Sequence, residues 1–434
     1  MKLVIVGTGY VGLVSGLCFA EFGFQTICVD KDPNRINDLN NNKSPFYEPG
    51  IDILLKKHLI ETKLLSLSSS LSESMIDADI IFITVGTPSK RLVNEADLSA
   101  VYKVAQEIAE NIKNYCLVVT KSTVPVGTTS KIKKIIGQIV NKENFDTVSN
   151  PEFLREGSAI SDFMRPDRVV IGCDNKKAEK MMRELYRPLY LLETPIVSTS
   201  IESAEIIKYA SNSFLATKIA FINQVADLCE AVGGDIQDVS KAMGIDNRIG
   251  SKFLHAGPGY GGSCFPKYVK AFISTAKNLN VNLSIIESVN DSNARRPQEI
   301  VSKILKHFDN NIKNKIFSIL GLSFKPNTDD VRDSTSMIIA ENLYKKGAII
   351  NAYDPKAMKN AKLILPNINY SDSVKSSCIN ANAIIIATEW NEFRALNFKK
   401  LKEQMNNHII FDLRNIYNKD ELTNLEFVYY GIGK

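Results

Sequence analysis

The chain has 434 residues, of which 44% are hydrophobic and 23% charged, and its formal net charge is +5. This composition is typical of a globular protein with two or three domains and argues against a nucleic-acid partner. No apolar run reaches the roughly 18 residues of a membrane span, so we expect no membrane segment. Seven cysteines without a CxxC pair, and a first strand pattern that starts at residue 2, favour a cytoplasmic location and no metal site.

The first 30 residues predict a dinucleotide-binding unit. A strand pattern over residues 2–6 is followed by GTGYVG, then by a helix pattern and a second strand. In this GxGxxG spacing, Gly7 permits a tight turn, Gly9 lets the backbone approach a pyrophosphate, and Gly12 permits close helix–strand packing. The N-terminus of the following helix attracts the phosphate charge. Asp30, at the end of the second strand, can accept hydrogen bonds from both ribose hydroxyls and would repel a 2′-phosphate, so the pattern favours NAD over NADP.

Three further strand patterns predict a crevice at one edge of the first sheet. They end near Thr87, at Thr123, and just before Glu152 and Glu156. Ligands of open α/β sheets lie outside the carboxyl ends of the strands, so these four side chains should face one crevice. The alternative for the two glutamates is the first turn of a helix, where acids are favoured anyway. Arg35, just past Asp30, either flanks the adenosine or is a solvated helix residue.

Residues 201–232 form the longest helical pattern, which ends at two glycines. Its length suits a spine between two domains, and its apolar surface favours a partner helix or a second subunit. Lys208 and Asn212 are four residues apart and therefore share one face of this helix. Together they could grip an oxyanion; the alternative is a solvated helix face.

From residue 315 the opening pattern recurs without GxGxxG, so this copy need not hold a dinucleotide. In place of the glycine turn, the loop at 324–334 carries Lys325 and Arg332. These two cationic side chains could bind a phosphate group. The sequence thus predicts an α/β fold with two Rossmann-like, doubly wound parallel-sheet domains joined by a long central helix. We expect an NAD-binding domain over 1–200, a central helical domain over 201–300, and a second, nucleotide-like domain over 301–434.

The stretch GYGGSCFPKY, residues 259–268, places Cys264 in a glycine-rich bend. Its neighbours are Gly, Ser and Pro, whereas the other six cysteines fit as packing residues. No histidine lies near it in the sequence.

Eight segments of the chain resemble motifs of the UDP-glucose/GDP-mannose dehydrogenase family and occur in the same order as in that family. They are GTGYVG, VGTP, KSTVPVGT, NPEFLREG, IIKYASN, RIGSKFL, GYGGSCFPK and FKPNTDDVRDS. The cysteine segment looks most like the UDP-glucose branch. The resemblance implies oxidation of UDP-glucose to UDP-glucuronate with two NAD, through a thiohemiacetal and a thioester on Cys264, in a homodimer or higher homo-oligomer. It also implies that residues 201–300 carry the dimerisation contacts and the cysteine loop, that residues 301–434 bind the UDP-sugar, and that the protein has a place in nucleotide-sugar metabolism and polysaccharide biosynthesis. The alternatives are oxidation of GDP-mannose or UDP-N-acetylmannosamine, or an impaired protein that only binds NAD and a nucleotide sugar.

The resemblance also assigns roles to residues. Cys264 would be the nucleophile, Lys208 and Asn212 would hold the oxygen that becomes anionic, Glu152 would move protons during hydrolysis, and Thr123 would order a water. The implied cofactor contacts are Gly7, Gly9, Tyr10, Val11, Gly12, Asp30, Arg35, Thr87, Pro88, Ser122, Thr123, Glu156, Lys267 and Arg332. The implied substrate contacts are Glu152, Phe153, Leu154, Arg155, Glu156, Lys208, Asn212, Arg248, Phe253, Leu254, His255, Ala256, Gly257, Tyr260, Gly261, Phe324, Lys325 and Arg414. Arg248 resembles an arginine that reaches a neighbouring subunit's substrate.

One position departs from the family pattern. The family reads Cys-Phe-Pro-Lys-Asp, with the aspartate a catalytic partner of the cysteine and the water, but this chain has Tyr268. A tyrosine side chain is bulkier and is neutral at pH 7. Loss of a positioned base costs roughly 10²–10⁴-fold in rate. We therefore expect intact ligand binding with weakened chemistry.

Overall fold

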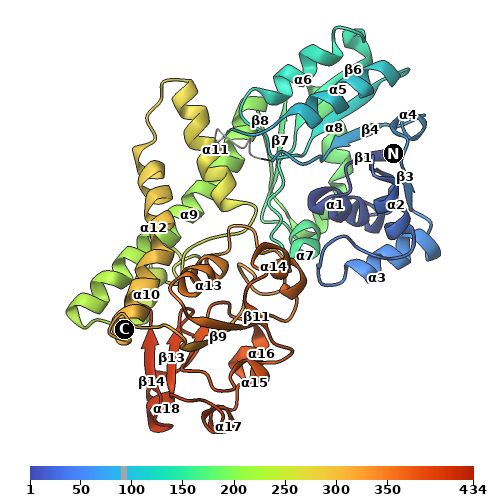
Figure 1. Ribbon diagram of the computed structural model, residues 1–434. Coiled ribbons are helices and arrows are strands. Elements are labelled where there is room, and N and C mark those ends of the chain that lie inside the picture. Colours follow the sequence, from blue (N-terminus) through green and yellow to red (C-terminus); the bar gives the residue numbers. More distant parts are fainter. Residues whose placement is uncertain (89–94) are drawn as a thin grey trace. The chain divides into compact units, whose positions relative to one another are not determined.

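The computed structural model of the protein describes residues 1–88 and 95–434 (Figure 1). It consists of two compact units, one of residues 1–211 with 277–279 and one of residues 212–276 with 280–434. The boundary falls inside the longest helix, α9 (Ile201–Val232), whose bounds are those that the sequence predicts.

The first unit is built on an eight-stranded sheet with the strand order β3-β2-β1-β4-β5-β6-β7-β8. Side chains of β1 alternate between two hydrophobic cores, with Leu3 and Ile5 in one and Val4 and Val6 in the other, so both faces of the sheet are covered. The strands are β1 (Lys2–Val6), β2 (Gln25–Val29), β3 (Leu65–Ser68), β4 (Ile80–Ile83), β5 (Cys116–Thr120), β6 (Phe145–Ser149), β7 (Val169–Cys173) and β8 (Ile196–Thr199). The α-helices of this unit are α1 (Tyr10–Glu21), α2 (Pro33–Asn40), α3 (Ile51–Lys56), α4 (Leu71–Ser74), α5 (Ser99–Asn111), α6 (Thr128–Ile136), α7 (Ala159–Met164) and α8 (Lys176–Leu185).

The second unit holds a six-stranded sheet with the order β11-β10-β9-β12-β13-β14. Its strands are all parallel, and again two cores cover its faces, one with Phe317 and Ile319 and the other with Ile384 and Ile386. The strands are β9 (Ile316–Leu320), β10 (Ile349–Tyr353), β11 (Asn369–Tyr370), β12 (Ala383–Ile386), β13 (Ile409–Asp412) and β14 (Val428–Gly431). The helices between and beside them are α13 (Thr335–Lys345), α14 (Met358–Ile364), α15 (Val374–Ser377), α16 (Asn391–Arg394), α17 (Phe398–Lys402) and α18 (Lys419–Asn424).

Both sheets share the 3-2-1-4-5-6 order of dinucleotide-binding folds over their first six strands, which confirms two Rossmann-like domains. The first sheet departs from a purely parallel one, because β7 runs antiparallel to β6. The edge strand β8 runs parallel to β7, so the last two strands of this sheet are both reversed relative to the other six.

The second unit also contains a helical layer formed by the C-terminal part of α9 with α10 (Ile236–Ile245), α11 (Phe265–Asn278) and α12 (Ser284–His307). Its small core comprises Ala216, Ala220, Tyr260, Val269 and Val289. Across residues 1–88 and 95–434, no helix is both long and apolar enough to cross a membrane.

Candidate functional site

The turn between β1 and α1 has the geometry that its glycines predict. Gly7 has a φ of +104°, and a Cβ at Gly12 would lie 1.8 Å from the carbonyl oxygen of Gly7, so no other residue fits at Gly12. By contrast, a Cβ at Gly9 would meet nothing within 4 Å. The backbone at Gly9, which caps α1, therefore has open space beside it, as the approach of a pyrophosphate requires.

Asp30 follows β2 and is almost fully buried beside this turn. Its Oδ2 accepts hydrogen bonds from the N–H of Thr8 at 2.9 Å and the hydroxyl of Thr8 at 2.7 Å, and it pairs with Arg35 at 3.3 Å. Burial raises the pKa of Asp30, but the hydrogen bonds from Thr8 and Asp32 and the charge of Arg35 outweigh it, so the net pKa is lowered. The acid is therefore an anion at neutral pH, and Arg35 is its partner rather than a merely solvated residue.

Sequence reasoning missed Glu48, which ties the turn to the loop after β6. The buried Glu48 carboxylate accepts hydrogen bonds from the Tyr10 hydroxyl, from the N–H of Gly157 at 2.6 Å and from the N–H of Ala159 at 2.8 Å. Glu48 thereby orders residues 155–159, just after Glu156. No local pattern marks this residue, since Tyr10 is 38 positions away from it and its two backbone partners are 109 and 111 positions away.

The ends of β4 and β5 meet as the strand-end argument predicts. The Thr87 hydroxyl donates to the backbone oxygen of Thr123 at 2.9 Å, and the Ser122 hydroxyl donates to that of Val85 at 2.7 Å. The buried hydroxyl of Thr123 has no hydrogen-bond partner within the described residues. An unpaired buried hydroxyl costs free energy, so it favours a bound water or ligand at this point.

Glu152 and Lys208 form a buried ion pair in the first unit. Their side chains are each 4% exposed, and Lys208 Nζ lies 3.0 Å from Glu152 Oε1. The other carboxylate oxygen accepts from the N–H of Leu154 at 2.6 Å. Because α7 begins only at Ala159, neither Glu152 nor Glu156 lies in the first turn of a helix. Lys208 and Asn212 are 3% and 8% exposed, which excludes the solvated-face alternative for both.

Cys264 directly precedes α11, with the backbone oxygen of Cys264 accepting from the N–H of Tyr268 at 2.9 Å. A helix N-terminus stabilises an anionic sulfur at this position. The Ser263 hydroxyl lies 3.6 Å from the Cys264 sulfur. Tyr268 is 7% exposed in the first turn of α11, and Lys267 Nζ lies 5.5 Å from the centre of its ring.

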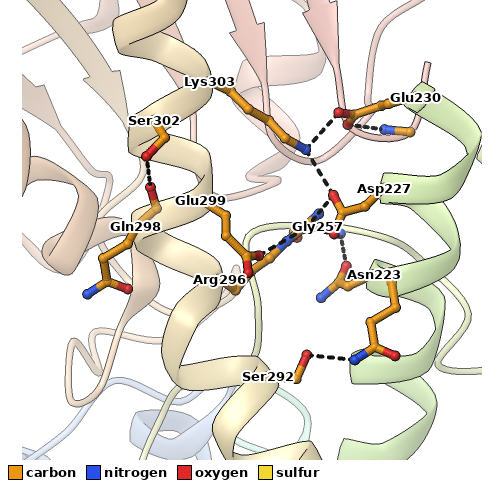
Figure 2. Close-up of polar contacts among 12 residues, drawn as sticks. Asn223, Asp227, Glu230, Gly257, Ser292, Arg296, Gln298, Glu299, Ser302 and Lys303 are labelled. Carbon is orange, nitrogen blue, oxygen red and sulfur yellow. Dashed lines mark hydrogen bonds and ion pairs between the residues drawn. The ribbon is translucent and has the colours of Figure 1, made fainter.

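The loop before Cys264 is held by side chains of α9 and α12, as Figure 2 shows. Asn223 accepts from the N–H of Gly257 at 2.8 Å, and Arg296 Nε donates to the Gly257 oxygen at 3.2 Å. Asn293 pairs with both backbone groups of Tyr260, at 2.8 and 2.9 Å. Arg296 is itself fixed by Asp227 at 2.7 Å. The loop is therefore rigidly placed, and the buried Tyr260 hydroxyl has no partner among the described residues.

The loop at 324–334 packs on the same glycine-rich bend within the second unit. Gly262 donates its N–H to the Arg332 oxygen at 2.9 Å, and a Cβ at Gly262 would lie 2.7 Å from the Phe324 ring. Arg414 donates to the backbone oxygen of Phe324 at 3.1 Å, and a Cβ at Gly257 would lie 3.7 Å from Arg414. Phe324, Arg414 and Gly257 are thus brought together.

Two of the expected arginines lie toward solvent. The Arg332 side chain is 66% exposed and pairs with Asp330 at 2.7 Å. Arg248 is 89% exposed and pairs with Asp246 at 2.6 Å. Of the remaining expected residues, Phe253 has a φ of +65° and its ring centre lies 6.1 Å from that of Phe265. Within the described parts of the chain, no group of three His, Cys, Asp or Glu side chains could hold a metal ion.

A glycine turn of this geometry, on a sheet of this strand order and beside a buried anionic Asp30, defines a Rossmann protein that binds a dinucleotide. Comparison with known proteins narrows the class. Residues 1–190, 202–295 and 318–419 match the NAD binding, central and UDP binding domains of the UDP-glucose/GDP-mannose dehydrogenase family. The chain belongs to this family and is an NAD-dependent oxidoreductase.

Individual relatives agree with this assignment. The chain is 47% identical over 436 residues to a UDP-glucose 6-dehydrogenase of Rhizobium meliloti, with 100% of both chains covered. A UDP-glucose dehydrogenase structure from Pyrobaculum islandicum is 34% identical with a TM-score of 0.91, covering 100% of this chain and 97% of that one. A UDP-D-ManNAc dehydrogenase structure from Pyrococcus horikoshii is 26% identical with a TM-score of 0.87, covering 100% and 99%.

Proposed function

We propose that this protein oxidises the C6 alcohol of UDP-glucose to the carboxylate of UDP-glucuronate. The observation that carries the proposal is the buried Glu152–Lys208 pair, which lies in the unit that carries the dinucleotide turn. The full-length likeness to proteins named UDP-glucose 6-dehydrogenase supports the same substrate. Oxidation of another nucleotide sugar is not favoured, because the UDP-D-ManNAc dehydrogenase of Pyrococcus horikoshii is only 26% identical.

The residues of the first unit fit NAD. The open space at Gly9 and the N-terminus of α1 would take the pyrophosphate, and Asp30 with Arg35 would take the adenosine ribose. NAD held there would supply the hydride acceptor for both oxidations. Further contacts that we propose are those of Thr87, Ser122 and Thr123, whose strand ends adjoin.

The chemistry of the chain's own residues centres on Cys264. After the alcohol has lost a hydride and a proton, the Cys264 thiolate adds to the aldehyde carbon and forms a C–S bond. Loss of a second hydride from this thiohemiacetal gives a thioester. A water then attacks the thioester carbon, the C–S bond breaks, and the thiolate and a carboxylate result. We assign stabilisation of the oxygen anion to Lys208 and Asn212, proton transfer from the water to Glu152, and ordering of the water to Thr123.

We assign the nucleotide-sugar contacts to the loop of residues 253–261, with Tyr260 beside the nucleoside, and to Phe324, Lys325 and Arg414. The rigid hold on Gly257 and Tyr260 supports this assignment, since a preorganised loop loses less entropy on binding. We also propose the division into domains over 1–200, 201–300 and 301–434 and a cytoplasmic location.

The proposal is tested by stoichiometry. Incubation with UDP-glucose and NAD should yield two NADH for each UDP-glucuronate released. GDP-mannose and UDP-N-acetylmannosamine serve as competitor substrates. A ratio of one NADH with aldehyde product, or a faster reaction with either competitor, would overturn the proposal. Thermal stabilisation by UDP-glucose without NADH formation would mark an impaired binding protein instead, the outcome that Tyr268 motivates.

The first prediction concerns the choice of cofactor. Asp30→Asn keeps the size of the side chain and removes the charge that would repel a 2′-phosphate, and it releases Arg35 from its ion pair. We expect the preference for NAD over NADP to fall by at least about tenfold, the effect of a lost charge-assisted hydrogen bond. The kcat/KM ratio for the two cofactors measures this. Equal use of NAD and NADP by the unmodified protein would remove Asp30 from the ribose.

The second prediction concerns assembly, which we propose to be a homodimer or higher homo-oligomer through the central helix. Phe214, Phe221, Leu228 and Val232 form an exposed apolar stripe on one face of α9, with exposed fractions of 64%, 50%, 62% and 73%. Such a stripe is costly to leave in water. Phe221→Glu should therefore reduce the particle to the 48.3 kDa of one chain in light scattering.

Leu363→Glu is the matched control for assembly, because Leu363 is an exposed apolar residue of α14, at 80%. It should leave the mass of the particle unchanged. A native protein that already runs at the mass of one chain would refute the proposed assembly.

A further inference from the structure

Lys121, the residue after β5, is a buried lysine whose hydrogen-bond partners are neutral groups. It is 4% exposed, and its Nζ donates to Asn150 Oδ1 at 3.0 Å and to the Tyr186 hydroxyl at 3.2 Å. The rings of Phe163 and Tyr186 lie 5.6 and 5.8 Å from the same nitrogen. None of the ion pairs found in the described part of the chain includes Lys121. Burying an ammonium group without an anionic partner costs free energy, and such costs are characteristic of functional sites.

The partners of Lys121 lead directly to Glu152. Asn150 follows β6 as Lys121 follows β5, and its N–H donates to the Thr120 oxygen at 2.9 Å. Asn150 Nδ2 donates to the Val170 oxygen at 2.7 Å, while its Oδ1 also accepts from the Tyr186 hydroxyl at 2.7 Å. Every polar atom of this amide is thus committed, and only Pro151 separates Asn150 from Glu152. The Lys121–Asn150 contact is therefore one of four hydrogen bonds that fix the chain two residues before Glu152.

Lys121 also acts on Glu152 through its charge. Burial lowers the pKa of Lys121 to about 8, while the Glu152 carboxylate and Cys18 of α1 counteract this and Lys208 of α9 reinforces it. The groups that face Lys121 are thus one carboxylate, one ammonium, one thiol and the phenol of Tyr186. Through space, its positive charge attracts Glu152 and repels Lys208.

We propose that Lys121 is a positioning residue for Glu152: it fixes the turn that carries the carboxylate and supplies a second positive charge to it in addition to that of Lys208. This inference rests on the proposed function, because Glu152 matters only if it moves protons during hydrolysis.

The test is the dependence of kcat on pH for NADH formation from UDP-glucose. Lys121→Met removes the charge and keeps the length of the side chain. The acidic limb of the pH profile, where kcat falls as the pH is lowered, should move to higher pH by at least about half a unit. The reason is that the loss of a neighbouring cation favours the protonated carboxyl. Lys121→Arg keeps the charge, and Tyr186→Phe removes a hydrogen bond to Asn150 but leaves the charge. Both should keep the acidic limb where the unmodified protein has it.

The outcomes separate this inference from the proposed function. A purely structural role would lower thermal stability or kcat in Lys121→Met without moving the acidic limb, and that result would overturn the inference while UDP-glucuronate is still made. If Glu152→Gln retains the acidic limb, the role of Glu152 itself is wrong and the inference falls with it. If Lys121→Met does not fold, the charge-preserving variants still decide: an acidic limb that moves in Tyr186→Phe would show that hydrogen bonding rather than charge sets it, and would overturn the inference.

Discussion

Replacing Cys264 by serine should abolish UDP-glucuronate formation, with a loss of at least about 10³-fold in kcat, because an alcohol at this position is neither ionised nor a good leaving group. Binding should survive, since the bend around Cys264 is held by backbone contacts, such as the N–H of Gly262 on the Arg332 oxygen at 2.9 Å. The Cys264 sulfur lies 3.6 Å from the Ser263 hydroxyl, and a serine at position 264 keeps nearly the same size. Product analysis and calorimetric titration with UDP-glucose measure the two effects.

Cys173→Ser is the matched control for the thiol. Cys173 ends β7 and is partly exposed, as Cys264 is, whereas Cys18, Cys28 and Cys116 are buried in the cores. The Cys173 variant should retain full activity. Unchanged UDP-glucuronate output from Cys264→Ser would return Cys264 to the packing cysteines and overturn the covalent mechanism.

The elements of the fold follow from local sequence patterns. Residues 2–6 form β1 and residues 201–232 form α9, as predicted, because apolar runs and helical periodicity are properties of neighbouring residues. The reversed direction of β7 was not predicted, since a short apolar run carries no sign of its direction. The two-domain architecture follows from the repeated strand–helix–strand pattern.

The candidate site residues also divide into those that a local pattern predicts and those whose role depends on contacts with distant segments. Gly7, Gly12 and Asp30 could be found because the turn chemistry fixes their spacing. Glu48 and Arg296 could not, because each acts on a backbone segment far away in the sequence. The burial of Lys208 depends on what packs against α9, so its polarity alone left two alternatives open.

Tyr268 raises a different kind of question, because the family pattern has an aspartate there. The residue is buried in the first turn of α11, four positions after Cys264, and its N–H bonds to the Cys264 oxygen. A carboxylate in the first turn of a helix is favoured by the helix dipole and would place an anionic proton acceptor near the thiol. A phenol, whose ordinary pKa is near 10, is not such an acceptor at neutral pH.

We therefore expect Tyr268→Asp to raise kcat by at least about tenfold, the lower part of the range for a restored base. The smaller side chain leaves a void in a site that is 93% covered, so a loss of thermal stability should accompany the gain. Tyr268→Asn separates the two effects, because it creates the same void without the charge and should gain no activity. Steady-state NADH production at saturating UDP-glucose and NAD decides between them. If the unmodified protein already turns over as fast as Tyr268→Asp, Glu152 and the water at Thr123 suffice for proton transfer, and the thiol never required an acid at position 268.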